Sequence, residues 1–218
     1  MTGKFITIEG IEGVGKSTNM AFLRDHLTAQ GQTVCVTREP GGTELAETIR
    51  QVILQQHDEP LSDSAELLLI FAARAVHLDN LVRPALARNE WVVCDRFTDA
   101  TYAYQGAGRG LPRGDIDAVR DLVQGDLRPD LTLLLDAPLK TSRGRVEARN
   151  NQKTGSVDRF EGEEQAFFER VRRAYLDIAA AEPDRIVVIN ADRPLVDVQE
   201  SLAHALDRLL IDKINKAI

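Results

Sequence analysis

The segment GIEGVGKST, residues 10–18, has the residue types and spacing of a phosphate-binding loop, Gly-x-x-x-x-Gly-Lys-Ser. Its glycines let backbone N–H groups converge on phosphate oxygens, Lys16 brings positive charge to the β and γ groups, and the Ser17 hydroxyl is suited to ligate Mg²⁺. The alternative is an ordinary glycine-rich turn, but the motif follows an apolar run and opens a helical pattern, as it must. We therefore predict a catalytic role for Lys16 and a nucleoside triphosphate site at Gly10, Ile11, Glu12, Gly13, Val14, Gly15, Lys16, Ser17 and Thr18.

A second pair of residues that could do chemistry, Asp95 and Arg96, lies near the end of the stretch WVVCDRF, residues 91–97. Asp95 could hold Mg²⁺ through a bound water, and Arg96 is suited to receive a second anion through its forked guanidinium. A GTPase would need an Asn-Lys-x-Asp guanine reader, but no Asp follows Asn215-Lys216. A motor or helicase-like ATPase would end this stretch in two acidic residues. The pattern favours a small kinase that transfers phosphate to a phosphate.

The elements that must position these groups can be read from the hydrophobic pattern. Short apolar runs at 5–8, 33–37, 91–94, 131–135 and 186–189 alternate with helical stretches at 17–30, 43–55, 62–88, 114–124, 138–150, 161–182 and 194–214. Runs that are apolar throughout are typical of parallel strands covered on both faces. We predict a single α/β domain over residues 1–218 with the P-loop NTPase fold, in which about five parallel strands are flanked by helices on both faces. The carboxyl ends of the strands would then bring the phosphate-binding loop and Arg96 to one edge.

The composition sets further bounds. The 218 residues are 43% hydrophobic and 28% charged. The net charge of −7 argues against nonspecific electrostatic binding of nucleic acid. No secretory leader and no membrane-spanning run is visible, so we expect a cytoplasmic protein. Cys35 and Cys94 lie in apolar runs and are expected to be buried free thiols. The four histidines show no ligand spacing, and we expect no protein-bound structural metal.

The polar stretch NNQKTGSV, residues 150–157, is the one break in composition. It is rich in turn-forming residues and has arginines on both sides, which predicts a mobile surface loop within a lid at about 143–160. The cations of this lid are Arg143, Arg145, Arg149, Lys153 and Arg159. Arg145 and Arg149 are four residues apart and would share a helix face.

Several longer strings, in order behind the phosphate-binding loop, resemble bacterial thymidylate kinase over nearly the whole chain. They are TREPGGTELAETIR (37–50), FAAR (71–74), DRFTDATYAYQGAGRGL (95–111), DLRPDLTLLLD (126–136) and DRFE (158–161). The resemblance implies transfer of phosphate from ATP to dTMP with Mg²⁺, giving ADP and dTDP for dTTP synthesis in DNA replication. It also implies a homodimer formed through helix faces such as 62–88.

The resemblance assigns most of the acceptor residues. Arg96 would anchor the monophosphate of dTMP, Arg50 could reach the same phosphate, and Pro40 would shape the loop after the second strand. Arg74 would read a carbonyl oxygen of thymine, and Thr101 would meet the ring edge.

The residue that stacks on the base is left open between Ile70 and Phe71, because both share a helix face with Arg74. Tyr104 would fill the space of a ribose 2′-hydroxyl. Gln105 and the glycines after it would form a loop over the acceptor pocket.

A carboxylate within the loop, Glu12, would repel a triphosphate if it faced one. The resemblance implies that it turns to the acceptor side, near the deoxyribose 3′-hydroxyl or a water at the metal. Gly13 stands where some relatives carry an arginine. Catalytic cations would then come from the lid, with Arg145 and Arg149 as the candidates.

Two rival functions remain. A kinase for dUMP or dCMP would share most of these residues. A nucleotide-binding switch or scaffold would use ATP without phosphorylating a metabolite, but it would not need a second nucleotide pocket with Arg96 and Arg74.

Overall fold

The computed structural model describes residues 3–150, 159–160 and 163–215. Its sheet has five parallel strands in the order β2-β3-β1-β4-β5. The strands are β1 (Phe5–Glu9), β2 (Val34–Arg38), β3 (Trp91–Asp95), β4 (Leu131–Asp136) and β5 (Ile186–Asn190). Each lies within one residue of a predicted run, which confirms the predicted α/β sheet.

The three inner strands explain why these runs are apolar throughout. Nearly all residues of β1, β3 and β4 are buried, whereas the edge strands β2 and β5 are partly exposed. Cys94 on β3 is therefore buried as expected, but Cys35 on the edge strand β2 is only partly so. Inside the sheet, the hydroxyls of Thr7 and Thr132 pair with each other at 2.7 Å, so neither is left unsatisfied.

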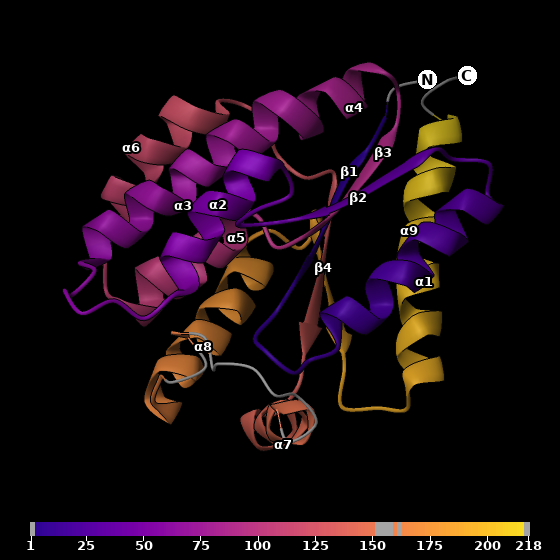
Figure 1. Ribbon diagram of the computed structural model, residues 1–218. Helices are drawn as coiled ribbons and strands as arrows, with labels where there is room; N and C mark the ends of the chain where they lie inside the picture. Colours follow the sequence, from indigo (N-terminus) through magenta and orange to yellow (C-terminus); the bar gives the residue numbers. More distant parts are fainter. Residues whose placement is uncertain (1–2, 151–158, 161–162, 216–218) are drawn as a thin grey trace.

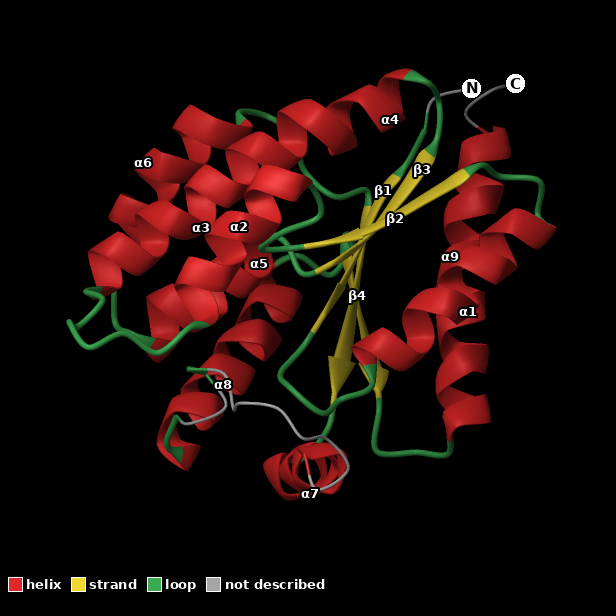
Figure 2. Cartoon of the chain, in the orientation of Figure 1, coloured by secondary structure: helices red, strands yellow, loops and turns green. Residues whose placement is uncertain are grey.

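Helices cover both faces of the sheet (Figures 1 and 2). One face carries α1 (Lys16–Ala29) and α9 (Leu195–Asn215), which contact each other. The other carries α8 (Gln165–Ala181) and a continuous helical run formed by α3 (Asp63–His77), the π-helical turn η1 (Leu78–Val82) and α4 (Arg83–Ala87). This run confirms the helix predicted at 62–88. Outside it lie α2 (Glu44–Leu54) and α6 (Arg113–Gln124), while α7 (Leu139–Asn150) follows β4.

The segment after β3 differs from the prediction. We expected Gln105 and its neighbouring glycines to form a loop, but the chain forms α5 (Thr98–Thr101) and then the π-helical segment η2 (Tyr102–Gly108). Close packing of η2 on α8 explains the glycine at the end of this segment. A Cβ at Gly108 would lie 2.6 Å from Cε2 of Phe167, so only glycine allows the two helices to approach this closely.

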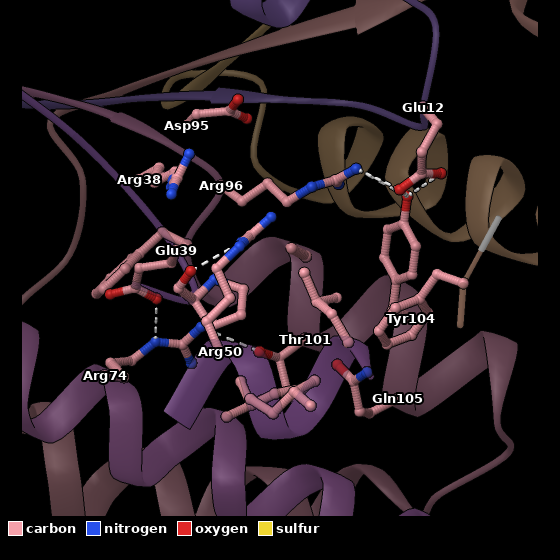
Figure 3. Close-up of a pocket in the computed structure, with 17 residues that line it drawn as sticks. Glu12, Arg38, Glu39, Arg50, Arg74, Asp95, Arg96, Thr101, Tyr104 and Gln105 are labelled. Atoms are coloured by element: carbon pink, nitrogen blue, oxygen red, sulfur yellow. Dashed lines mark hydrogen bonds and ion pairs between the residues drawn. The ribbon is translucent and has the colours of Figure 1, made fainter. Parts of the chain in front are cut away.

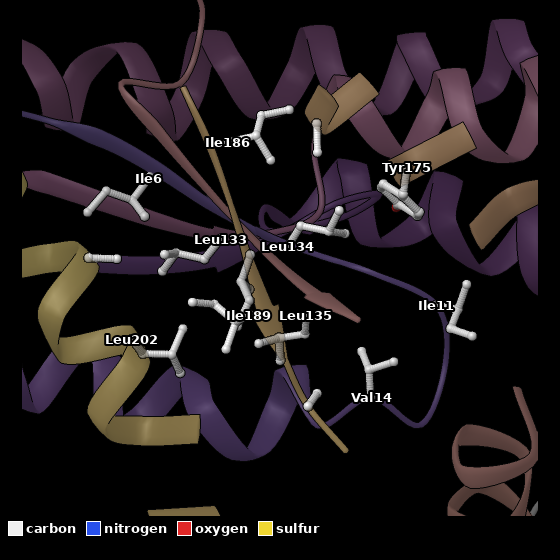
Figure 4. Packing of buried hydrophobic residues seen from close by; sticks show 14 of the residues in the cluster. Ile6, Ile11, Val14, Leu133, Leu134, Leu135, Tyr175, Ile186, Ile189 and Leu202 are labelled. Atoms are coloured by element: carbon white, nitrogen blue, oxygen red, sulfur yellow. The ribbon is translucent and has the colours of Figure 1, made fainter. Parts of the chain in front are cut away.

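The largest hydrophobic cluster joins the sheet to helices on both faces (Figure 4). It includes Ile6, Leu133 and Leu202, and also two residues of the phosphate-binding segment, Ile11 and Val14. Ile11 is 3% exposed and Val14 2%, so these side chains anchor the loop in the core and fix its path. None of the helices in the described part of the chain is long and apolar enough to cross a membrane.

Candidate active site

The phosphate-binding segment connects the end of β1 to the start of α1. Gly13 and Gly15 have φ values of 80° and 98°, which glycine adopts without steric cost. Lys16 Nζ donates to the carbonyl oxygens of Gly10 at 2.9 Å and Ile11 at 3.0 Å. Burial of this ammonium and the nearby Arg96 charge lower the pKa of Lys16 to about 8. Ser17 and Thr18, at the start of α1, are exposed.

Helix α7 lies directly over Gly13. A Cβ at this glycine would lie 2.1 Å from the carbonyl oxygen of Ser142 and 3.0 Å from Cγ2 of Val146. No side chain fits there unless α7 moves. This contact explains why the central position of the loop carries no arginine, and it places the lid helix beside the phosphate-binding segment.

Arg96 connects this segment to the second predicted group. Its Nη1 donates to the Gly10 carbonyl at 2.9 Å and to the Tyr175 hydroxyl at 3.1 Å. Its Nη2 contacts a carboxylate oxygen of Glu12 at 2.8 Å and the Tyr104 hydroxyl at 3.0 Å (Figure 3). Burial opposes the charge of Arg96, but the surrounding tyrosines and Glu12 hold its pKa well above the ordinary value.

Glu12 therefore turns toward the acceptor side. Both of its carboxylate oxygens also accept from the Tyr104 hydroxyl, at 2.9 and 2.8 Å. The negative charge is neutralised by Arg96 rather than left facing the phosphate-binding glycines.

A pocket opens beside this ion pair (Figure 3). Nearly all predicted acceptor residues line it, together with Asp95: they are Glu12, Pro40, Arg50, Ile70, Arg74, Arg96, Thr101, Tyr104 and Gln105. Arg38 also lines the pocket, as do Glu39, Phe97 and Phe160, which we did not predict. Arg50 reaches the pocket from α2 and donates to the Pro40 carbonyl at 2.8 Å.

Arg74 forms one end of the pocket. Its Nε donates to Glu39 at 2.6 Å and its Nη2 donates to the Thr101 hydroxyl at 3.1 Å. Its Nη1 is buried and has no hydrogen-bond partner among the described residues. The guanidinium carbon lies 4.6 Å from the ring centre of Phe71 and 4.9 Å from that of Phe97.

Phe71 does not line the pocket, which corrects one of the two alternatives for base stacking. Its ring contacts the guanidinium of Arg74 and packs with Leu67 and Ile116 in a separate cluster between α3 and α6. On α3 it is Ile70 that reaches the pocket wall. Sequence spacing could not separate the two, because both are buried on the helix.

Two buried carboxylates hold the site in place. Glu9 accepts from the Phe97 N–H at 2.6 Å and from the Tyr175 hydroxyl at 2.8 Å, so it links the end of β1 to the segment after β3 and to α8. Glu66 on α3 accepts from Gln105 at 2.6 Å and also pairs with Arg159. Glu66 and Tyr175 could not be predicted from a local motif, because their partners are distant in the sequence.

The predicted lid cations separate into different environments. Arg159 binds Glu66 and its backbone N–H donates to the Leu54 carbonyl at 3.1 Å, so it is committed to α2 and α3. Arg145 donates to the Ala191 carbonyl at 3.1 Å, after β5. Arg143 and Arg149 lie exposed on α7, and Lys153 lies outside the described residues.

The arrangement defines a class of protein: a kinase with the P-loop fold, whose phosphate-binding segment adjoins a second pocket with anion-binding residues. Comparison with known proteins identifies the family. The family model described as Thymidylate kinase matches residues 8–202, and the chain belongs to this family.

Relatives agree over almost the full length. The chain is 56% identical to the thymidylate kinase of Pseudomonas savastanoi pv. phaseolicola, covering 96% of this chain and 98% of that protein. It is also 56% identical to that of Methylococcus capsulatus, covering 95% and 97%. The crystal structure of thymidylate kinase from Ehrlichia chaffeensis superimposes with a TM-score of 0.74 at 32% identity, covering 96% of this chain and all of that one.

Proposed function

We propose that this protein transfers the γ-phosphoryl group of ATP to dTMP, giving ADP and dTDP. The observation that carries the proposal is the direct link between the phosphate-binding segment and the acceptor pocket. Arg96 is hydrogen-bonded to Gly10 and Glu12 and also lines the pocket. A donor on one side and an acceptor on the other would meet at this arginine.

The acceptor phosphate is already ionised at neutral pH, so its oxygen can attack without a general base. Catalysis is then a matter of positioning and of stabilising charge. In this proposal Arg96 and Arg50 bind the monophosphate, and Lys16 exchanges its bonds to the loop carbonyls for phosphate oxygens. Glu12 holds Arg96 in orientation and accepts a hydrogen bond from the acceptor sugar.

The residues present also fit Mg²⁺. Asp95 has a buried carboxylate oxygen without a hydrogen-bond partner in the described part of the chain, and Ser17 presents a hydroxyl at the start of α1. Asp95 would hold the ion through water and Ser17 directly. The ion would neutralise charge on the donor phosphates.

Arg145 and Arg149 on α7 are the proposed cations for the transferred group. Both belong to the helix that covers Gly13, and arginines in such positions contribute on the order of 10³–10⁵ in rate. Arg159 is not proposed for this role, because Glu66 binds it.

The base and sugar would be selected at the far side of the pocket. Arg74, Ile70 and Thr101 line the pocket there. Arg74 would donate to a carbonyl oxygen of thymine, Ile70 would provide an aliphatic surface for the ring, and Thr101 would meet its edge. Tyr104, which is hydrogen-bonded to Glu12 and Arg96, would fill the space that a ribose 2′-hydroxyl needs.

A coupled ADP-release assay with Mg-ATP tests the proposal, comparing dTMP, dUMP, dCMP, dGMP and no acceptor. We expect turnover with dTMP that falls by about 10²–10³ in Arg96→Ala, because a bidentate charged contact is lost. Preferred turnover with dUMP or dCMP would favour a different nucleotide kinase. ATP hydrolysis indifferent to every monophosphate would contradict the proposal and favour a switch or scaffold.

We also propose a cytoplasmic homodimer, formed through the layer of α2 and α3. Leu45 and Val52 are 57% and 41% exposed on one face of α2, and Leu68 on the adjoining α3 is 59% exposed. Sedimentation equilibrium of Leu68→Lys should show dissociation. Val196→Lys, at an equally exposed position on α9, should keep the oligomeric state of the parent protein.

A further inference from the structure

We propose that Thr37, His77 and Glu39 form a positioning chain that fixes the orientation of the Arg74 guanidinium at the wall of the acceptor pocket, and thereby the choice of base. The inference rests on the proposed function, because it takes Arg74 as the group that meets a pyrimidine. It adds residues outside the pocket, Thr37 and His77, as determinants of specificity.

The chain of contacts is continuous. The Thr37 hydroxyl lies 2.7 Å from His77 Nε2, and His77 Nδ1 lies 2.9 Å from Glu39 Oε1. The other carboxylate oxygen, Oε2, accepts from Arg74 Nε at 2.6 Å. An ionised carboxylate only accepts, so Nδ1 carries the proton, and in the neutral ring Nε2 takes the Thr37 hydroxyl as its donor.

The side chains in this chain have little freedom to rearrange. His77 is fully buried, Arg74 is 2% exposed and Glu39 3%. The Glu39 backbone N–H donates to the Asp95 carbonyl at 2.9 Å, which holds the start of the turn. The turn after β2 also lies close to His77. A Cβ at Gly42 would lie 2.4 Å from Thr37 Oγ1 and 2.7 Å from His77 Nε2. Glycine at this position keeps the imidazole against Glu39.

A buried ion pair that served only stability would be expected to satisfy all its donors. Arg74 does not: Glu39 takes Nε, Thr101 takes Nη2, and Nη1 is buried with no partner in the residues described. A buried donor without a partner is costly, so the guanidinium is matched to an acceptor that arrives with a ligand. Glu39 accepts from Nε and Thr101 accepts one N–H of Nη2, so these two contacts fix the plane of the guanidinium at the pocket wall.

The fixed donor has a consequence for the base. A carbonyl group on the pyrimidine ring can accept from the guanidinium of Arg74, whereas the exocyclic amino group of cytosine presents a second donor to it. Sites built around one hydrogen bond reject the wrong partner strongly only while the site group cannot turn away. Loss of the His77 contact would let the Glu39 carboxylate rotate and Arg74 follow it, which would weaken the discrimination.

The test compares dTMP with dCMP in steady-state kinetics of the full chain. In His77→Leu we expect KM for dTMP to rise about tenfold and the dTMP:dCMP ratio of kcat/KM to fall about tenfold, because a prealigned donor is lost. KM for ATP should stay the same. His77→Asn, whose amide can replace the Nδ1 donor to Glu39, should recover most of the ratio. Thr37→Val keeps the side-chain shape and should give a smaller fall of about threefold.

The controls separate positioning from loss of stability. Val82→Ala removes fully buried apolar volume in the same helical run outside the chain of contacts, so it should lower the melting temperature without changing the ratio. An unchanged dTMP:dCMP ratio in both His77→Leu and Thr37→Val, while the parent protein phosphorylates dTMP, would overturn this inference alone. A parent protein that does not phosphorylate dTMP would overturn the proposed function and the inference together.

Discussion

Arg96 Nη2 lies 2.8 Å from Glu12 Oε1, so the residue that follows β3 is paired with the middle of the phosphate-binding segment. The pair is 16% and 22% exposed, which leaves it largely shielded from solvent. The carboxylate that looks misplaced in the sequence is therefore the partner that orients the acceptor-side arginine. Tyr104 bonds to both members and completes the link.

Glu12→Gln should lower kcat/KM for dTMP about tenfold. The amide keeps the size of the side chain but loses the charge that holds Arg96, and charge-assisted hydrogen bonds of this kind contribute about 1.5–3 kcal/mol. Tyr104→Phe, measured in the same assay, should cause a loss in the same direction. Because both residues act on Arg96, the double variant should lose less than the sum of the single losses, and full additivity would show that they act independently.

The affinity for Mg-ATP should decrease above pH 8. Burial and the Arg96 charge lower the pKa of Lys16 to about 8, so the ammonium of the empty protein loses its proton above that pH. Phosphate groups would restore the charge, and binding would take up one proton between pH 8 and the higher pKa of the complex. Titration calorimetry should show Kd rising about tenfold per pH unit in this range. Lys16→Arg keeps a charge that does not titrate, so a similar slope in that variant would contradict this account.

Gly13→Ala should destabilise the protein and reduce kcat. The new methyl group would lie 2.1 Å from the Ser142 carbonyl oxygen, and the φ of 80° is unfavourable for alanine. Displacement of α7 should lower the free energy of unfolding by roughly 1–3 kcal/mol, measured by denaturant titration. Gly144→Ala is the matched control on α7, because its Cβ would meet nothing within 4 Å. If the two variants had the same free energy of unfolding and the same kcat, the contact between Gly13 and α7 would not contribute to stability or activity.

Glu9→Gln should remove a pH dependence of stability. Burial and the nearby Asp99 charge raise the pKa of Glu9 to about 8, although Arg96, Tyr175 and the Phe97 N–H oppose the shift. The contribution of Glu9 is thus fully present below pH 4.5 and is lost as the pH rises to 8, because ionisation is harder in the folded state. Between about pH 5 and 8 the parent protein should lose unfolding free energy that the Glu9→Gln variant keeps. The difference between the two proteins should therefore shift in favour of the variant by roughly 1–4 kcal/mol over this range. A constant difference across this range would argue against a raised pKa.

The phosphate-binding loop and the alternation of strands and helices could be predicted because they depend on neighbours in the chain. Gly10, Gly13 and Gly15 act through backbone conformation, and each strand is marked by its own apolar run. Arg96 and Asp95 follow directly from β3 in the same way. For such features, the residue types and their spacing are enough to predict the local structure.

The helical path of 98–108 could not be predicted in this way. Gly106, Gly108 and Gly110 are common in loops, but η2 is stabilised by packing on α8, about sixty residues further along the chain. The choice between Ile70 and Phe71 stayed open for a similar reason, since only the packing of α3 on α6 shows that Phe71 lies in a separate cluster.

By itself, the sequence determined the chemistry at the start of α1, the parallel sheet and the family of the protein, because these depend on local order along the chain. The tertiary structure alone decided how the polar and charged groups are paired. Glu9 and Tyr175 are 166 positions apart, Arg159 meets Glu66 across 93, and Glu39 meets His77 across 38. Burial makes an unpaired charge costly, so these partners are chosen by proximity in the folded core, which no linear spacing records.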